Sequence, residues 1–439
     1  MTIPHSMATT PNIRFIDHDT NYNIWYNISM LKRYRYRAYP TGEQTQAAMR
    51  TFGCVRTVYN DFIAERSRLY ADGRHTAVSF DETAKNTTTL AKLRPERAWL
   101  ADVSSTPLQQ ATRDARQAYS HFFSSVTGKR AGKRVGLPRF KSRRDHQQKA
   151  RFTRNCGFSV RETTHGVGFV RLPKIGHVRF TLSRPLPSDP SSVTLIREGD
   201  SRYYVSFVVD VPSQTADTTN TVAGVDVGLF DLATIALSDG RRYKVANPRH
   251  LKTRARKLAR CQRALSRTKK GSKNRDKARR RLATEYRKIR ETHRDFLHKT
   301  ALSLVRENQA IAVEDIFVTG LMQTRMARSI ADASWGTFLR LIREKATAYG
   351  RDVFVIDRWT PTTRTCSVCG TVGEKKSLAV REWTCARCDT RLDRDYNAAV
   401  NIMVAAGLAE TLNACGGSVR QRLAVADPVK QEPTEQLRC

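Results

Sequence analysis

Acidic residues are scarce in this sequence compared with basic ones. Its 439 residues include 77 lysines and arginines but only 41 aspartates and glutamates, which gives a formal net charge of +36. Such a surplus repels itself unless it meets a polyanion, so nucleic acid is the expected partner and an anionic membrane surface is the alternative. A chain of this length can form two or three domains with cores of their own.

The sequence also lacks the features of membrane and secreted proteins. It has no apolar run of about 18 residues, so no transmembrane helix is expected. No basic start followed by an apolar stretch is present, so no signal peptide is expected. We therefore predict a protein of the reducing cytoplasm, because five of the nine cysteines are scattered singly rather than arranged as a disulfide framework: Cys54, Cys156, Cys261, Cys415 and Cys439.

The other four cysteines form two closely spaced pairs. Two residues separate Cys366 from Cys369 and Cys385 from Cys388, and fifteen residues lie between the pairs. Four thiolates at this spacing predict one structural Zn²⁺ in a zinc ribbon at residues 364–390, with no open coordination position. Coincidental free thiols and a redox role are the weaker alternatives.

The first half of the chain combines helical and β-strand patterns. Residues 44–149 have mostly helical spacing after a turn and capping sequence at residues 40–43. Residues 150–215 contain short β-runs separated by turns, which predict a small antiparallel β-barrel that the strand at 30–43 also joins. The polar residues 1–29 are expected to be a disordered extension.

Basic residues are concentrated in two segments that we expect to contact nucleic-acid phosphates. Between Lys129 and Arg151, ten residues are basic and one is acidic, although a solvated loop is the alternative. Between Arg249 and Lys299, within a helical hairpin predicted at residues 250–300, 21 residues are basic and four are acidic. An ordinary coiled-coil arm would mix the two signs. The candidate contacts are Arg139, Lys141, Arg254 and Lys257.

The second half of the chain predicts a mixed α/β domain at residues 220–410. A meander of three strands precedes two basic helices, and then a strand, a helix, a strand and a last helix follow. This is the element order of an RNase H-like domain, with the cysteine segment inserted before the last helix. The whole chain is thus a multidomain protein of α+β and α/β type, and residues 411–439 are expected to be a flexible tail.

An RNase H-like nuclease needs carboxylates on its first strand, at the end of its fourth strand and on its last helix. Two divalent ions about 4 Å apart would be held there to act on a phosphodiester. Asp226 is the first candidate, because Gly224 and Gly228 share its face of the strand and leave room for ions and a phosphate.

The second and third acids each have two candidates. Strand alternation does not decide between Glu314 and Asp315, although the small Ala312 on the same face weakly favours Glu314. On the last helix, Asp395 shares the apolar face and points into the domain, whereas Asp393 has the position of an N-cap or loop residue.

Several motifs in one order resemble the TnpB family, the transposon-encoded RNA-guided nucleases related to type V CRISPR effectors. The resemblance spans about residues 30–433, and residues 1–29 have no counterpart in it. Its main motifs are Gly-Val-Asp-Val-Gly at 224–228, Val-Glu-Asp at 313–315, the two cysteine pairs, and Asp-Arg-Asp-Tyr-Asn-Ala-Ala at 393–399.

The resemblance implies a RuvC nuclease domain in which Asp226, Glu314 and Asp395 bind two Mg²⁺ ions and cut DNA. It implies that the barrel is a wedge domain and that residues 44–149 are a recognition domain. It also implies a guide RNA from the transposon end, and a target double-stranded DNA chosen by base pairing beside a short motif. Within the last motif, Arg394 is a further candidate for nucleic-acid contact. The resemblance also implies action at the nucleoid of a prokaryotic cell.

Three other functions remain as alternatives. A DDE-type transposase would use the same acids for strand transfer. A nuclease-dead RNA-guided repressor would have lost one of the three acids, and all three are present. A plain zinc-ribbon RNA-binding protein would leave the acids unexplained.

Overall fold

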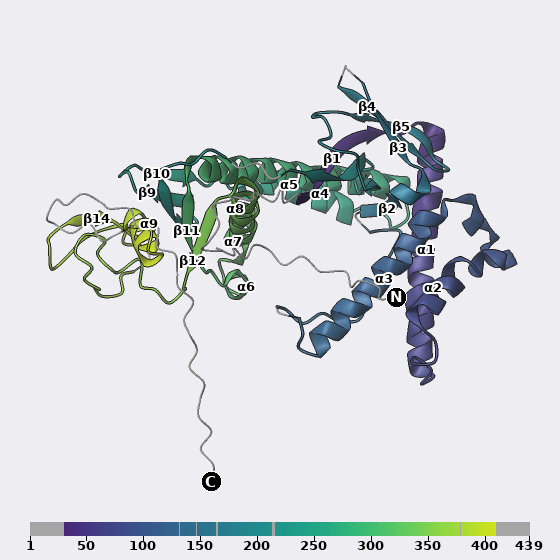
Figure 1. Ribbon diagram of the computed structural model, residues 1–439, viewed down its shortest axis with the longest axis horizontal. Coiled ribbons are helices and arrows are strands. Elements are labelled where there is room, and N and C mark those ends of the chain that lie inside the picture. Colours follow the sequence, from purple (N-terminus) through teal and green to yellow (C-terminus); the bar gives the residue numbers. More distant parts are fainter. Residues whose placement is uncertain are drawn as a thin grey trace, which may run out of the picture.

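The computed structural model describes residues 30–409, apart from 131, 146, 164–165, 213–215 and 378. The extension predicted at residues 1–29 and the tail predicted at 411–439 lie outside the described residues. Figure 1 shows two sheets at opposite ends of the long helix α5 (Lys273–Glu307), which α4 (His250–Ser266) accompanies. Among the described helices, none is both long and apolar enough to cross a membrane.

The first sheet has seven antiparallel strands in the order β2-β6-β7-β1-β5-β4-β3. They are β1 (Met30–Tyr39), β2 (Gln147–Thr153), β3 (Ser159–Glu162), β4 (Val167–Leu172), β5 (Gly176–Thr181), β6 (Ser192–Glu198) and β7 (Tyr203–Val211). The strand β1 lies in the middle, between β7 and β5, which confirms that the first strand joins the later ones. Tyr36, Phe180 and Phe207 pack their rings together in the core of this sheet.

This sheet is open, so the prediction of a closed β-barrel is wrong. The edge strands β2 and β3 are not paired with each other. Instead, β2 packs against two helices, and Arg151 forms an ion pair with Asp114 at 2.6 Å. The sheet therefore stays open, with β2 and β3 at its two edges.

Three helices pack beside the first sheet: α1 (Gly42–Ala71), α2 (Phe80–Thr88) and α3 (Ser105–Val126). A capping box starts α1, because the side chains of Thr41 and Gln44 each accept a hydrogen bond from the other residue's backbone N–H. Short 3₁₀ turns occupy Ala91–Leu93, Pro95–Asp102 and Arg154–Cys156. The buried side chains of Phe52, Val58 and Phe62 join α1 to the core of the sheet.

The second sheet has five strands in the order β10-β9-β8-β11-β12. They are β8 (Val222–Val227), β9 (Asp231–Leu237), β10 (Arg242–Ala246), β11 (Ala310–Glu314) and β12 (Asp352–Ile356). The first three form an antiparallel meander, and β11 and β12 run parallel to β8. This arrangement is compatible with the RNase H-like domain that the element order predicts.

Helices cover both faces of the second sheet. On one face, Ala223 and Val225 of β8 pack with α5 and α8 (Trp335–Tyr349). On the opposite face, Val222 packs with Met403 of α9 (Arg394–Ala405). The remaining elements are α6 (Val318–Leu321), α7 (Ala327–Ala333), β13 (Glu382–Thr384) and β14 (Arg391–Asp393).

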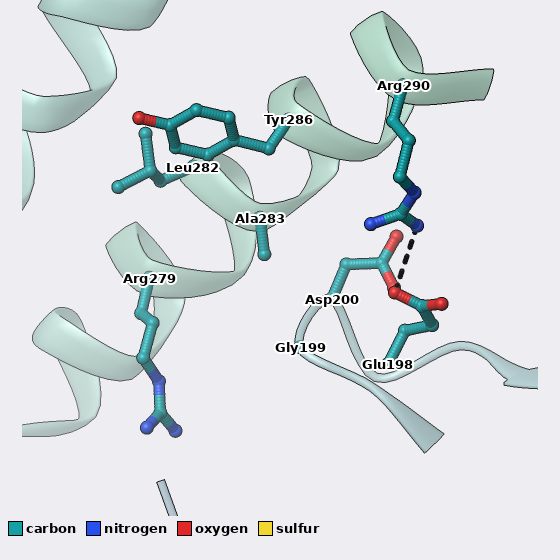
Figure 2. Close-up of a pocket in the computed structure, with 8 residues that line it drawn as sticks. All are labelled: Glu198, Gly199, Asp200, Arg279, Leu282, Ala283, Tyr286 and Arg290. Atoms are coloured by element: carbon teal, nitrogen blue, oxygen red, sulfur yellow. Dashed lines mark hydrogen bonds and ion pairs between the residues drawn. The ribbon is translucent and has the colours of Figure 1, made fainter. Parts of the chain in front are cut away.

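Charged residues hold α5 to the turn between β6 and β7 (Figure 2). Glu198 accepts from Arg290 of α5 at 3.0 Å and from Arg35 of β1 at 2.6 Å. In the same turn, Asp200, whose side chain is buried, pairs with Arg287 at 2.6 Å. Burial alone would raise the pKa of Glu198, but hydrogen bonds from Arg35 and other donors lower it below its ordinary value. The ionised carboxylate therefore stabilises this joint between the two halves.

Candidate active site and metal centre

Two of the predicted acids lie at the same level on neighbouring strands. The parallel register pairs Val313 of β11 with Val225 of β8, so Glu314 comes next beside Asp226. Residues at one level of adjacent parallel strands point to the same face. Ala312, two residues before Glu314, packs with Ile402 of α9, which identifies this face as the one that α9 covers.

Gly224 allows α9 to approach β8 closely. A Cβ atom at this position would overlap the carbonyl oxygen of Ala399 and would lie 2.9 Å from Cβ of Met403. The space predicted for ions beside Gly224 is therefore filled by α9. The close approach brings Asp395, one helical turn before Ala399, toward Asp226.

The two acids at the start of α9 have different environments. Asp393 is the N-cap and accepts hydrogen bonds from the backbone N–H groups of Asp395 and Tyr396, both at 2.9 Å, as predicted. It also accepts from Nζ of Lys244 at 2.8 Å, and this hydrogen bond lowers its pKa although burial opposes the shift. The Asp395 carboxylate lies 3.8 Å from Lys244 Nζ and 3.5 Å from Arg381, and its side chain is 21% exposed.

Electrostatic coupling joins the three acids. Burial, together with the charges of Asp395 and Glu314, raises the pKa of Asp226 to about 8. Burial and the neighbouring Asp315 raise the pKa of Glu314 above its ordinary value. The structure thus brings Asp226, Glu314 and Asp395 together, whereas Asp315 forms an ion pair with Arg358.

The four paired cysteines also come together. All four Sγ atoms lie within 4.8 Å of one another, with Cys366 and Cys388 at 3.7 Å and Cys369 and Cys385 at 3.6 Å. Thiolates about 2.3 Å from a tetrahedral Zn²⁺ would be separated by roughly 3.8 Å, so the cluster fits that ion. Of the His, Cys, Asp and Glu side chains in the described part of the chain, these four cysteines form the group with ligand atoms close enough together to share one metal ion.

The two cysteine pairs adopt the same backbone arrangement. The N–H of Cys366 donates to the carbonyl of Thr371, and the N–H of Cys385 donates to the carbonyl of Thr390. The residue after each second cysteine, Gly370 with φ of 72° and Asp389 with φ of 52°, turns the chain through the left-handed region. The cluster is therefore built from two matching knuckles.

Two buried asparagines of α9 hold the segment that enters the first knuckle. Asn397 Oδ1 accepts from the backbone N–H of Ser367 at 2.8 Å. The side-chain amides of Asn397 and Asn401 both donate to the carbonyl of Thr365 at 2.7 Å. Asn401 and Lys244 were not predicted from the sequence. The i, i+4 spacing of the two asparagines could have revealed the first, whereas no local pattern distinguishes Lys244 from other surface lysines.

The predicted nucleic-acid contacts are dispersed over the molecule. Lys257 and Arg254 pair with Glu285 of α5 at 2.9 and 3.5 Å, so they also link the two hairpin helices. Lys141 lies over the Tyr59 ring at 3.7 Å and lines a cavity of about 800 Å³ between the helices and the first sheet.

The two remaining candidates, Arg139 and Arg394, lie in different surroundings from each other. The side chain of Arg139 is exposed. Arg394 donates to the carbonyl of Ser377 at 2.8 Å and lines a basic cavity of about 300 Å³ with Arg364, Lys375 and Lys376. None of these contacts decides whether nucleic acid binds there, so the assignments remain predictions.

Three family models match the chain. The first is described as "Probable transposase" and covers residues 206–325, and the second, "Cas12f1-like, TNB domain", covers 335–402. The third is described as "Helix-turn-helix domain" and covers residues 30–75, which form β1 and α1 in this structure.

Curated relatives match nearly the whole chain. A protein of Streptomyces pristinaespiralis named "Putative RNA-guided DNA endonuclease" is 39% identical, over 92% of this chain and 96% of its own length. A protein of Escherichia coli strain K12 named "Putative RNA-guided DNA endonuclease InsQ" is 28% identical, over 93% of this chain and 99% of its own length. Proteins of Acanthamoeba polyphaga mimivirus named TnpB-like match at 25% identity over half of this chain.

A solved structure supports the fold. The protein in "Cryo-EM structure of the Cas12f1-sgRNA-target DNA complex" aligns with a TM-score of 0.52 and 12% identity, over 85% of this chain and 98% of that one. Fold and site together define a mixed α/β protein with a carboxylate centre and a four-cysteine cluster. The chain belongs to the TnpB family.

Proposed function

We propose that this chain is an RNA-guided DNA endonuclease of an insertion sequence, which hydrolyses DNA phosphodiesters at guide-matched targets beside a short motif. The names of its relatives support this reading, as does the net charge of +36, which suits two nucleic-acid partners. The observation that carries the proposal is the convergence of Asp226, Glu314 and Asp395 from two strands and a helix.

The acid centre offers carboxylate donors for divalent cations, although its three acids are less compact than the four thiolates, and we assign it two Mg²⁺ ions. Carboxylate oxygens are the hard ligands that Mg²⁺ prefers. Burial raises the pKa of Asp226, and the charges of Asp395 and Glu314, which a cation would offset, raise it further. When bound, the ions would supply Lewis-acid stabilisation of the attacking and leaving oxygens. Asp226 and Glu314 hold their carboxylates on rigid neighbouring strands, and Lys244 holds the N-terminal turn of α9 that presents Asp395.

The cysteine cluster is assigned one structural Zn²⁺, because four thiolates leave no position for a substrate. Its proposed task is to brace α9. Asn397 and Asn401 connect the first knuckle to this helix, and β14 ends at Asp393, the N-cap of α9. The metal would therefore act on cleavage through the position of Asp395.

We further propose a division of the chain into functional parts, acting on nucleoid DNA in a prokaryotic cytoplasm. Arg139, Lys141, Arg254, Lys257 and Arg394 are proposed to contact the guide RNA or the target DNA. The parts are a wedge domain at 30–43 and 150–215, a recognition domain at 44–149, and a RuvC-like domain at 220–410 with its basic hairpin at 250–300 and its zinc ribbon at 364–390.

Purification after expression with flanking transposon DNA tests this proposal. We expect a discrete RNA to copurify, and Mg²⁺-dependent cleavage of a matched double-stranded target to occur. Joined strands instead of hydrolysed ends would favour a strand-transfer transposase. RNA-dependent binding without any cleavage would favour a repressor, and the absence of bound RNA would contradict the proposal.

A further inference from the structure

Exposed aromatic side chains gather next to the acid centre. Among the described phenylalanines and tryptophans, four are more than half exposed: Phe140 (62%), Phe230 (68%), Phe317 (59%) and Trp359 (84%). The last three follow strands of the second sheet, and we call them the aromatic rim. Large apolar side chains in contact with water are informative when they cluster, because such clusters mark interaction surfaces.

The rim residues share one edge of the sheet with the acids. Phe230 lies in the β8–β9 turn four residues after Asp226, and Phe317 lies three residues after Glu314. Trp359 lies three residues after the end of β12. Because β8, β11 and β12 are parallel, their carboxyl ends meet at the same edge. The rim and the acids therefore lie at the same edge of the sheet.

Two of the three rim positions, Phe317 and Phe230, have local support. A Cβ atom at Gly320 would overlap the ring of Phe317, so this ring lies directly on the backbone of α6. The turn that carries Phe230 is fixed, since Trp335 donates from Nε1 to the carbonyl of Gly228 at 3.0 Å. A supported ring can bind a flat partner at a low cost in conformational entropy.

Each of the two phenylalanines has an arginine beside it. The guanidinium of Arg358 lies 5.6 Å from the ring centroid of Phe317, and that of Arg249 lies 5.6 Å from the ring centroid of Phe230. Aromatic faces next to cations form the combination that binds single-stranded nucleic acid, with bases stacked on the rings and phosphates near the charges.

We infer that the aromatic rim stacks the unpaired bases of a single DNA strand as it enters the acid centre. Bases in a duplex are already stacked on one another, so a row of exposed rings suits successive bases of an unwound strand better than a duplex. The inference rests on the proposed nuclease function and specifies the state of its substrate. A second copy of this strongly basic chain would bring arginines against arginines, which favours the polyanion as the occupant.

Photo-crosslinking tests the inference directly. The full chain with its copurified RNA, carrying Asp226→Asn to prevent cutting, is irradiated with a single-stranded oligonucleotide that contains 5-iodouracil. We expect crosslinks at Phe230, Phe317 or Trp359. At a fixed salt concentration, Trp359→Ala is expected to weaken binding of the same oligonucleotide roughly tenfold. Trp359→Tyr is expected to preserve binding. Trp359→Leu keeps an apolar side chain but loses the stacking face, so it is expected to weaken binding as Trp359→Ala does.

Tyr70→Ala is the matched control, because Tyr70 is 66% exposed near the end of α1 and distant in sequence from the acids. Unchanged affinity in the Phe230→Ala, Phe317→Ala, Trp359→Ala triple variant, without crosslinks at the rim, would overturn the inference. So would a loss of self-association in this variant without a loss of oligonucleotide binding. Cleavage by the otherwise wild-type chain is measured separately, and its absence would refute the nuclease proposal while leaving the crosslinking result valid.

Discussion

Asn397 accepts a hydrogen bond from the backbone N–H of Ser367 at 2.8 Å, and this contact joins the helix of Asp395 to the first cysteine knuckle. Asn397 is 2% exposed, and its amide group also donates to the carbonyl of Thr365. A buried amide that serves both functions fixes the knuckle relative to the helix. The cysteine cluster and the acid centre are therefore one mechanical unit.

Asn397→Ala is expected to weaken this unit. The substitution leaves the Ser367 N–H without its acceptor and the Thr365 carbonyl with one donor fewer, at a cost of about 3 kcal/mol in the free energy of unfolding. Urea denaturation measures the loss, and we expect faster release of zinc to a chelator. Glu374→Ala, at an exposed position in the same insertion, is the control. Equal stability of the two variants would show that the contact is dispensable.

Gly224→Ala is expected to abolish cleavage without unfolding the protein. The added methyl group would displace α9 and move Asp395 away from Asp226. The control is Gly42→Ala, because a Cβ at Gly42 would meet nothing within 4 Å. Cleavage of a matched target is compared with target binding by gel shift. Full activity of Gly224→Ala would contradict the packing of α9 described here.

Removal of the cysteine ligands is expected to affect DNA cleavage at the acid centre, although the cysteines are not part of that centre. We predict one zinc per chain in wild type and none in Cys366→Ser/Cys385→Ser, measured by atomic absorption. Because the knuckles brace α9, this double variant should lose DNA cleavage while it retains RNA through the first half of the chain. If the zinc-free variant cuts as well as wild type, the bracing role is wrong.

The metal-free protein is expected to lose stability as the pH rises. Asp226 has its pKa raised from 3.8 to about 8, so its favourable contribution is complete below the unfolded value and is lost as the pH rises through the folded one. The unfolding temperature of wild type without Mg²⁺ should therefore decrease as the pH is raised from about 4 to about 8. Added Mg²⁺ should raise the unfolding temperature more near pH 8 than near pH 4. In differential scanning fluorimetry, Asp226→Asn should weaken both the pH dependence of the unfolding temperature and its increase with Mg²⁺. A Mg²⁺ shift that survives this substitution unchanged would locate the cation elsewhere.

Local patterns in the sequence were sufficient to find the cysteine cluster and the element order of the second sheet. Ligand spacing reports directly on a tetrahedral site, so Cys366 and Cys388 could be paired in one cluster from sequence alone. The N-cap position of Asp393 was likewise predictable, because its preference is set by the next few residues.

Long-range packing was not predictable in the same way. The choice between Glu314 and Asp315 depends on the register of β11 against β8, which no single strand specifies. The glycine at 224 was interpreted as open space, but its role follows from the approach of α9, nearly 180 residues later in the chain. The prediction of a closed barrel failed for a related reason, because closure depends on whether the distant strands β2 and β3 pair, and they do not.

Cleavage of a guide-matched double-stranded target by variants of the three acids tests the central claim most directly. The purified chain with its copurified RNA is assayed in Mg²⁺ as wild type, Asp226→Asn, Glu314→Gln and Asp395→Asn, with Asp315→Asn as the neighbouring control. The account predicts that each of the first three substitutions lowers the cleavage rate by a factor of about 1,000 or more, while RNA retention and target binding persist and Asp315→Asn remains active. Wild-type cleavage by any one of the three variants would contradict a nuclease centre built from these acids.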